Sequence, residues 1–156
     1  MGAGGYVLGA PGSGKTAVAA TLRALLPTWV VLDWDAFMDP AGALAGAAIR
    51  ETPSTWSAYG ELVRAAFDQL APHPVLLLGV VTPDELAGWP SGRWVVLDCT
   101  DEERLRRLRT RGDSEDSVIQ AVADAAEYRG LGLPVVDSTT RTPAETARAL
   151  VELLTS

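Results

Sequence analysis

One eight-residue segment near the start of the chain limits the possible folds more than any other feature. Residues Gly9 to Thr16 read Gly-Ala-Pro-Gly-Ser-Gly-Lys-Thr and fit the pattern G-x-x-x-x-G-K-[ST] completely. A short apolar run, Tyr6 to Leu8, precedes this segment, and a helical pattern from Lys15 to about Leu26 follows it. The pattern predicts a strand that ends in a tight glycine-rich turn and continues directly into a helix.

This P-loop segment has the chemistry of an anion site. Its glycines allow the backbone to turn N–H groups inward, and the helix that follows adds a partial positive charge at its first turn. Lys15, the only lysine among thirteen basic residues, is expected to contact the β and γ phosphates of a nucleoside triphosphate. The hydroxyl of Thr16 is expected to ligate Mg²⁺. The whole predicted cofactor-binding set in this segment is Gly12, Ser13, Gly14, Lys15, Thr16 and Ala17. The alternative is an ordinary glycine-rich turn.

Short apolar runs recur along the chain and predict five strands. They are Tyr6–Leu8, Trp29–Leu32, Val75–Leu78, Trp94–Leu97 and Leu133–Val136. The runs are continuously apolar instead of alternating, which is typical of parallel strands covered on both faces. Helical patterns separate them, including a long stretch from about Pro40 to Leu70. We therefore expect residues 1–156 to form a single three-layer α/β/α domain around a five-stranded parallel sheet.

Three of the predicted helices carry the same start signal, a Thr followed three residues later by Glu. The pairs are Thr82 with Glu85, Thr100 with Glu103, and Thr142 with Glu145. Each pair fits a capping box, in which the two side chains satisfy free N–H groups at a helix start. Proline stands at the first helical position after Thr82 and Thr142, where a missing N–H costs nothing.

Composition argues against several classes of binding partner. A net charge of −7 argues against nucleic acid, because Lys and Arg drive binding to phosphate backbones. No apolar stretch approaches the roughly 20 residues that cross a bilayer, and the first residues lack the pattern of a signal peptide. Cys99 and His73 are each the only residue of their type, so no cysteine or histidine metal cluster is expected. We expect a cytoplasmic protein, a monomer or a homodimer, without membrane or nucleic-acid partners.

With its P-loop in this context, the sequence resembles the P-loop kinases of small molecules. That group includes shikimate, gluconate and adenylate kinases and the chloramphenicol phosphotransferases, and the resemblance covers most of the chain. It implies a P-loop NTPase fold, ATP and Mg²⁺ as cofactors, and transfer of the terminal phosphoryl group to a small-molecule acceptor. The second strand of such kinases ends in Asp-x-Asp, and Asp33-Trp34-Asp35 stands in that place here.

The resemblance assigns Asp33 to the metal and Asp35 to the acceptor, as a catalytic base or an anchor for its hydroxyl. The alternative is that either residue only caps the following helix. Asp98, at the end of a later strand, looks superficially like a Walker B acid, but its strand comes later than the one that usually carries the metal carboxylate. Asp33 is therefore the favoured ligand.

The segment from Thr100 to Arg111 predicts a helix rich in arginine. At helical spacing Arg104, Arg107 and Arg111 share one flank and can converge on a ligand. In the resembling kinases an R-L-x-x-R segment here begins the lid and holds ATP, which implies nucleotide binding by Arg107 and a catalytic role for Arg111. The alternative is a solvated face paired with neighbouring glutamates. The predicted linker to the next helix, Gly112 to about Asp116, is too short for a folded lid domain.

The stretch from Phe37 to Tyr59 occupies the position of acceptor-binding helices. Its candidate residues, with the preceding Trp, are Trp34, Phe37, Arg50, Glu51, Trp56 and Tyr59. Trp56 and Tyr59 fit a flat acceptor and a helix core equally well. The third strand lacks the Gly-aromatic-Pro-Arg turn that is typical of nucleoside monophosphate kinases. A hydroxyl acceptor is therefore the first hypothesis, a nucleoside monophosphate the second, and a regulatory nucleotide-binding module without phosphotransfer the third.

Overall fold

The computed structural model describes residues 4–156; the first three residues, which entered the argument against a signal peptide, lie outside this part. Its strands are β1 (Gly4–Leu8), β2 (Val30–Asp33), β3 (Val75–Gly79), β4 (Gly92–Asp98) and β5 (Val135–Asp137). Its α-helices are α1 (Lys15–Leu25), α2 (Met38–Ala45), α3 (Trp56–Gln69), α4 (Asp101–Arg111), α5 (Glu115–Arg129) and α6 (Pro143–Thr155). Three short 3₁₀ turns lie between β2 and α3: η1 (Trp34–Phe37), η2 (Ile49–Glu51) and η3 (Pro53–Thr55). All five predicted strands are confirmed.

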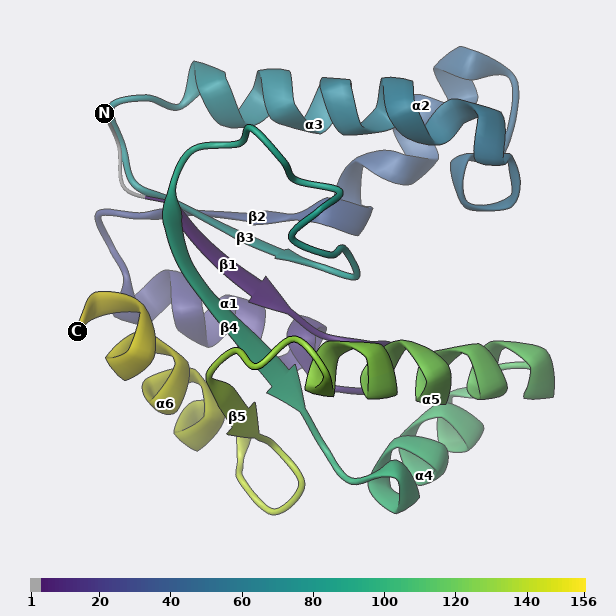
Figure 1. Ribbon diagram of the computed structural model, residues 1–156, viewed down its shortest axis with the longest axis vertical. Helices are drawn as coiled ribbons and strands as arrows, with labels where there is room; N and C mark the ends of the chain where they lie inside the picture. Colours follow the sequence, from purple (N-terminus) through teal and green to yellow (C-terminus); the bar gives the residue numbers. More distant parts are fainter. Residues whose placement is uncertain (1–3) are drawn as a thin grey trace.

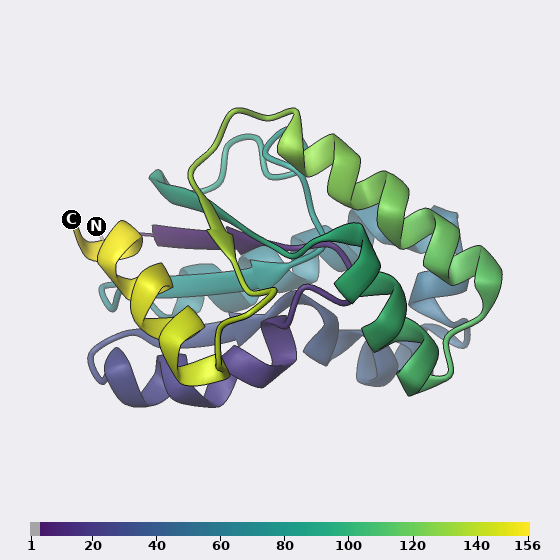
Figure 2. The same cartoon turned by 90° about the horizontal axis from the view of Figure 1, so that it is seen from below.

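The strands form one parallel sheet in the order β2-β3-β1-β4-β5. β1 lies at the centre, with Tyr6 opposite Leu77 of β3 and Trp94 of β4. Helices cover both faces of this sheet (Figures 1 and 2). The predicted three-layer α/β/α P-loop NTPase fold is therefore confirmed.

Alternation along each strand divides the apolar side chains between two cores. Val75 and Leu77 of β3 face a core to which α3 and α5 contribute, while Leu76 and Leu78 face the core packed by α1 and α6. Helix α3 presents Tyr59, Val63 and Phe67 to the sheet at a spacing of four residues, one face of a helix. The double coverage explains why the strand sequences show no polar alternation.

The predicted helix at the Thr82 capping box is wrong. Residues 83–88 form a series of turns, in which Leu86 N donates to Thr82 O at 3.3 Å and Ala87 N to Asp84 O at 3.2 Å. Gly88 then takes a positive φ of 80°, which ends any helical continuation. So short a segment cannot offset the free-energy cost of helix nucleation.

The other two start signals are confirmed as caps. Thr142 and Glu145 form the complete box at the start of α6. Thr100 accepts from Glu103 N at the start of α4, but the Glu103 carboxylate turns to Arg106 and Arg107 instead of closing the box. Local sequence thus fixes where both helices begin. Among residues 4–156, no helix is long and apolar enough to cross a membrane.

Candidate active site

The P-loop leaves β1 at the carboxyl edge of the sheet and enters α1 at Lys15. Gly12 and Gly14 have φ angles of 83° and 102°, a region that residues with a Cβ rarely adopt. At Gly9 an added Cβ would lie 2.5 Å from the Ser13 hydroxyl oxygen. The glycines of the motif are therefore required by the backbone path itself.

The Lys15 ammonium group lies inside the loop that carries it. It donates to Gly9 O and, at 3.2 Å, to Ala10 O. Burial lowers the pKa of Lys15 to about 8, the charge of Asp35 opposes this shift, and the charges of Arg104 and Arg111 add to it. The fold thus places Asp35 and Arg111, the other two predicted catalytic residues, where their charges act on Lys15.

Arg104 is fully buried, so the prediction that it can converge on a ligand with Arg107 and Arg111 is wrong. Its side chain is fully buried beneath the P-loop and donates to Pro11 O at 2.6 Å and Ala10 O at 3.3 Å. Its other terminal nitrogen pairs with Asp98 at 2.5 Å. Within residues 4–156 its Nε has no hydrogen-bond partner. Arg104 therefore connects α4, β4 and the P-loop.

Asp98 is the partner of two arginines. Besides Arg104, it accepts from Arg129 Nε of α5 at 2.6 Å, and Arg129 also pairs with Asp101 at 3.0 Å. Both of its oxygens are used in these contacts. The placement supports the preference for Asp33 over Asp98 as a metal ligand. A sequence signal existed, since a carboxylate at a strand end facing an arginine-rich helix is a candidate ion pair.

Arg107, which was predicted to bind nucleotide, lies directly against the P-loop. It donates to Gly12 O at 3.0 Å and to both oxygens of Ser138, at 3.1 and 3.0 Å. Ser138, which the sequence gave no reason to select, donates to Ser13 O at 2.7 Å. Arg106 and Arg107 together lower the pKa of Glu103 to about 2, so this carboxylate stays charged and keeps Arg107 oriented.

Asp33 and Asp35 lie where β2 ends, beside the P-loop edge of the sheet. Asp33 is the N-cap of η1, because its Oδ1 accepts from Asp35 N at 2.9 Å. Asp35 projects into the large cleft described below and lies 3.7 Å from the Arg50 guanidinium. The capping alternative therefore describes one contact of Asp33, while Asp35 is free of that role.

The residues assigned to Mg²⁺ fit a hard cation in type. Thr16 is exposed on the first turn of α1, and only Oδ1 of Asp33 takes part in the cap. In the described part of the chain no group of three or more His, Cys, Asp or Glu residues could hold a metal ion. Mg²⁺ usually needs only one or two protein oxygens, since phosphates and water complete its shell. A hydroxyl and one carboxylate therefore suffice.

A cleft of about 1080 Å³ opens beside the P-loop. Residues within the segments 34–38, 56–64, 80–89 and 111–124 line it, with Pro11 and Arg50. Arg111 reaches it from the end of α4 and forms two hydrogen bonds with Asp113, at 2.7 and 2.5 Å. Only residues 112–114 separate α4 from α5, which confirms the short linker and the absence of a folded lid within the described chain.

The acceptor candidates separate into two groups. Trp34, Arg50, Trp56 and Tyr59 line the cleft, whereas Phe37 and Glu51 are not among its lining residues. Tyr59 is a core residue whose hydroxyl donates to Trp34 O and whose ring meets that of Trp34 edge-on. Trp56 is 55% exposed. The sequence fitted Tyr59 and Trp56 equally well to the helix core and to an acceptor site. The structure places Tyr59 in the core and leaves Trp56 half exposed in the cleft.

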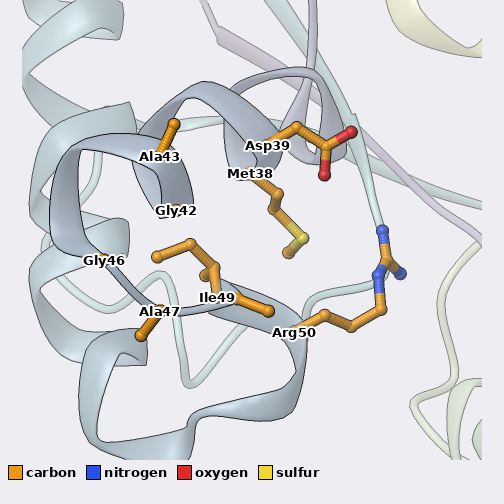
Figure 3. Close-up of a pocket in the computed structure, with 9 residues that line it drawn as sticks. Met38, Asp39, Gly42, Ala43, Gly46, Ala47, Ile49 and Arg50 are labelled. Carbon is orange, nitrogen blue, oxygen red and sulfur yellow. The ribbon is translucent and has the colours of Figure 1, made fainter.

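A second, smaller pocket of about 360 Å³ lies between α2 and η2. Figure 3 shows Met38, Ile49 and Arg50 along its wall. Met38 and Arg50 line the large cleft as well, so the two hollows are neighbours.

The strand order, the P-loop and the residues around it define a P-loop NTPase domain. A model of the family described as "AAA domain" matches residues 6–127, and the chain belongs to this family. No curated protein sequence matches the chain.

Solved structures share the fold over nearly the whole chain. The tunicamycin resistance protein of Deinococcus radiodurans is 19% identical, with a TM-score of 0.73 over 97% of this chain and 95% of that one. Shikimate kinase from Acinetobacter baumannii, in complex with shikimate, is 20% identical, with a TM-score of 0.67 over 98% and 93%. A gluconokinase from Sinorhizobium meliloti 1021 is 18% identical, with a TM-score of 0.64 over 98% and 91%. At these identities the likeness establishes the P-loop kinase-like fold.

Proposed function

We propose that this protein is an ATP-dependent kinase that transfers the γ-phosphoryl group to a hydroxyl of a small molecule. The observation that carries the proposal is that Asp35 and Arg111, from separate segments, line the large cleft together with Pro11 of the P-loop, and that the charges of both act on Lys15. The kinase names of two solved structures with this fold support the same class of reaction.

The proposed reaction exchanges one P–O bond for another. The acceptor oxygen bonds to the γ-phosphorus, the bond to the β–γ bridging oxygen breaks, and ADP leaves with the bonding pair. The hydroxyl proton passes to Asp35, which lies in the cleft, and from there to water. Lys15 and Arg111 stabilise the charge on the transferred group, and Arg107 fixes the P-loop through Gly12 O.

Mg²⁺ would be held by Thr16 and Asp33 and would neutralise charge on the β and γ phosphates. The sequence places the Thr16 hydroxyl at the start of the helix that follows the anion-binding loop. Asp33 keeps one carboxylate oxygen outside its capping bond. The assignment predicts that chelation of Mg²⁺ abolishes transfer and that its return restores transfer.

The cleft favours a hydroxyl over a phosphate as the acceptor group. A phosphate needs bidentate arginine contacts, but the two arginines of the acceptor region already pair with carboxylates: Arg50 with Asp35 and Arg64 with Asp68. A nucleoside monophosphate remains the second candidate because Arg50 is 68% exposed and its 3.7 Å contact is loose. A regulatory module without transfer is the third.

ADP release across a panel of alcohols and nucleoside monophosphates, with Mg-ATP, tests the proposal. Lys15→Ala should lose nearly all release, and the matched change Arg148→Ala, on the exposed side of α6, should lose none. Efficient turnover of a monophosphate that Arg50→Ala abolishes would favour the second candidate. ATP binding without release for any acceptor would favour the regulatory module.

Asp35→Asn tests whether Asp35 acts as the catalytic base. The amide keeps the size and the hydrogen bonds of the carboxylate but cannot take a proton. Turnover should fall by roughly 10² to 10⁴, while ATP binding survives. Unchanged turnover would show that Asp35 does not accept the proton.

A further inference from the structure

The charges that line the large cleft do not balance. Five carboxylates and three arginines face it within residues 4–156. Each arginine lies within ion-pair distance of a carboxylate, and one of them, Arg64, uses Asp68 from outside the lining. In the described part of the chain Glu61, Glu85 and Asp124 have no Lys or Arg at ion-pair distance. The cleft therefore presents unneutralised negative charge.

The three carboxylates come from different walls. Glu61 lies on α3, Glu85 in the turns after β3, and Asp124 on α5, where Gln120 Nε2 donates to it at 2.9 Å. Burial raises the pKa of Glu85, and the nearby acids Asp84 and Glu127 raise it further. This environment opposes the charged form of Glu85, and a cation placed in the cleft would relieve that opposition.

Aromatic rings line the same cleft, and one of them is fixed with much of its surface exposed. Trp56 is 55% exposed, yet its Nε1 donates to Ile49 O at 2.9 Å, which orients the indole. Trp89 already carries a cation, since the Arg64 guanidinium carbon lies 5.7 Å from its ring centroid. Indole faces attract cations, with about 0.5 kcal/mol at exposed sites and about 2 kcal/mol when water is excluded.

These observations together favour an acceptor with a positive charge. We propose that the acceptor is a cation: a hydroxyl compound with a protonated amine or a quaternary ammonium group, held by Trp56 and by the carboxylates of Glu61 and Asp124. This inference rests on the proposed kinase function, because the same cleft supplies both. Asp35 would face the hydroxyl, and the aromatic and acidic walls would hold the charged group. An anionic acceptor would meet three unpaired carboxylates.

Two matched sets of probes test the proposal by binding, without any transfer step. Choline is compared with its neutral isostere 3,3-dimethylbutan-1-ol, and glucosamine with glucose and the anion gluconate. Each is titrated into ¹⁵N-labelled protein, and the five Trp indole signals are followed. We expect at least one cation to move the Trp56 signal and to bind roughly tenfold more tightly than its neutral partner. Equal or tighter binding of the neutral or anionic probes, or no binding of either cation, would overturn the proposal.

Variants locate the effect in the cleft. Glu61→Gln combined with Asp124→Asn should remove most of the preference for the cation over its neutral partner. Asp116→Asn removes a charge from the same helix as Asp124 but outside the cleft, and it should leave the preference intact. Trp56→Phe should weaken cation binding less than Trp56→Ala. A preference that survives the double variant would contradict the assignment of these carboxylates.

ADP release distinguishes failure of this inference from failure of the proposed function. Release that is efficient with neutral alcohols, together with no cation preference, would leave the kinase and remove the cationic acceptor. Selective cation binding without release for any acceptor would leave the cleft assignment and remove the kinase.

Discussion

The environment of Lys15 affects the charge of its ammonium group. Its amino group is surrounded by main-chain oxygens of its own loop, and burial works against the proton that makes it useful to a phosphate. Arg104 and Arg111 add to the lowering, while Asp35 and Asp33 oppose it. A bound triphosphate would supply the missing negative charge and restore the proton. An anionic ligand would therefore favour the charged form of Lys15.

Because Lys15 is the only lysine, its titration can be observed directly. In protein labelled with ¹³Cε-lysine and freed of metal and nucleotide, the single signal should titrate with a midpoint near pH 8. The unfolded chain keeps this proton to about pH 10.5. Between the two values the unfolded state binds more protons, so Lys15 makes the free energy of unfolding rise with pH in that window. A midpoint near 10.5 would contradict the buried environment.

Asp33 has a capping contact and a proposed metal role, and one substitution separates them. Asparagine caps as well as aspartate but carries no charge, so Asp33→Asn should change the free energy of unfolding by less than about 0.5 kcal/mol. The Mg²⁺ concentration for half-maximal ADP release should rise by roughly 10- to 100-fold. An unchanged Mg²⁺ requirement would limit Asp33 to the cap. Denaturant titration and the Mg²⁺ dependence of release are the two measurements.

At the scale of elements, α4 holds the P-loop through the side chains of two arginines. Arg104 crosses from this helix to Pro11 O and Asp98, and Arg107 reaches Gly12 O one turn later. The Arg spacing along α4 predicted that Arg104, Arg107 and Arg111 share a flank, and Arg104 and Arg107 do contact the same loop. It did not predict that one member would be buried, because burial depends on the carboxylate of β4 and on the open carbonyls of the loop.

Removing Arg104 should therefore destabilise the fold as well as the loop. Arg104→Met keeps most of the side-chain length but leaves the carboxylate of Asp98 with only Arg129. Breaking a buried pair costs about 3 to 5 kcal/mol, and urea denaturation would measure the loss. Arg109→Met, on the same helix at a site 58% exposed, is the control and should lose only a small fraction of that. Equal losses of unfolding free energy in the two variants would show that the contacts of Arg104 with Asp98 and the P-loop do not stabilise the fold.

The turns between β3 and β4 show where local signals fail. Thr82 and Glu85 carry the same start signal as Thr142 and Glu145, yet only the second pair begins a helix. A cap lowers the free energy of a helix start by about 1 kcal/mol, which a long helix such as α6 can use. The stretch ending at Gly88 is too short to use it, and its Glu85 lines the cleft instead.

At the scale of the whole molecule, the sequence predicted the layers because the central strands β1 and β3 are buried on both faces and are continuously apolar. It also predicted that the P-loop and the two aspartates meet at one edge, since parallel strands end on the same side. The contribution of Ser138 was not predictable. Ser138 follows the last strand, 125 residues after its partner Ser13, and only the strand order brings the two together.

That same arrangement connects the proposed nucleotide site to the whole fold. Through Arg104 and Arg107 the P-loop is connected to α4, to the end of β4 and to Ser138 beyond β5. A ligand that binds only the folded state at 100 times its dissociation constant adds about 2.7 kcal/mol to the free energy of unfolding.

For a chain of this length, each kcal/mol shifts the midpoint of thermal unfolding by about 2 to 4 °C. Mg-ATP at that saturation should therefore raise the midpoint by about 5 to 11 °C in a calorimetric scan. Lys15→Ala should abolish the rise, and chelation of Mg²⁺ should reduce it, because both remove contacts to the phosphates. Arg148→Ala should show the full rise. A wild-type midpoint that does not respond to any nucleoside triphosphate would contradict phosphate binding by the P-loop, and with it the proposed kinase function.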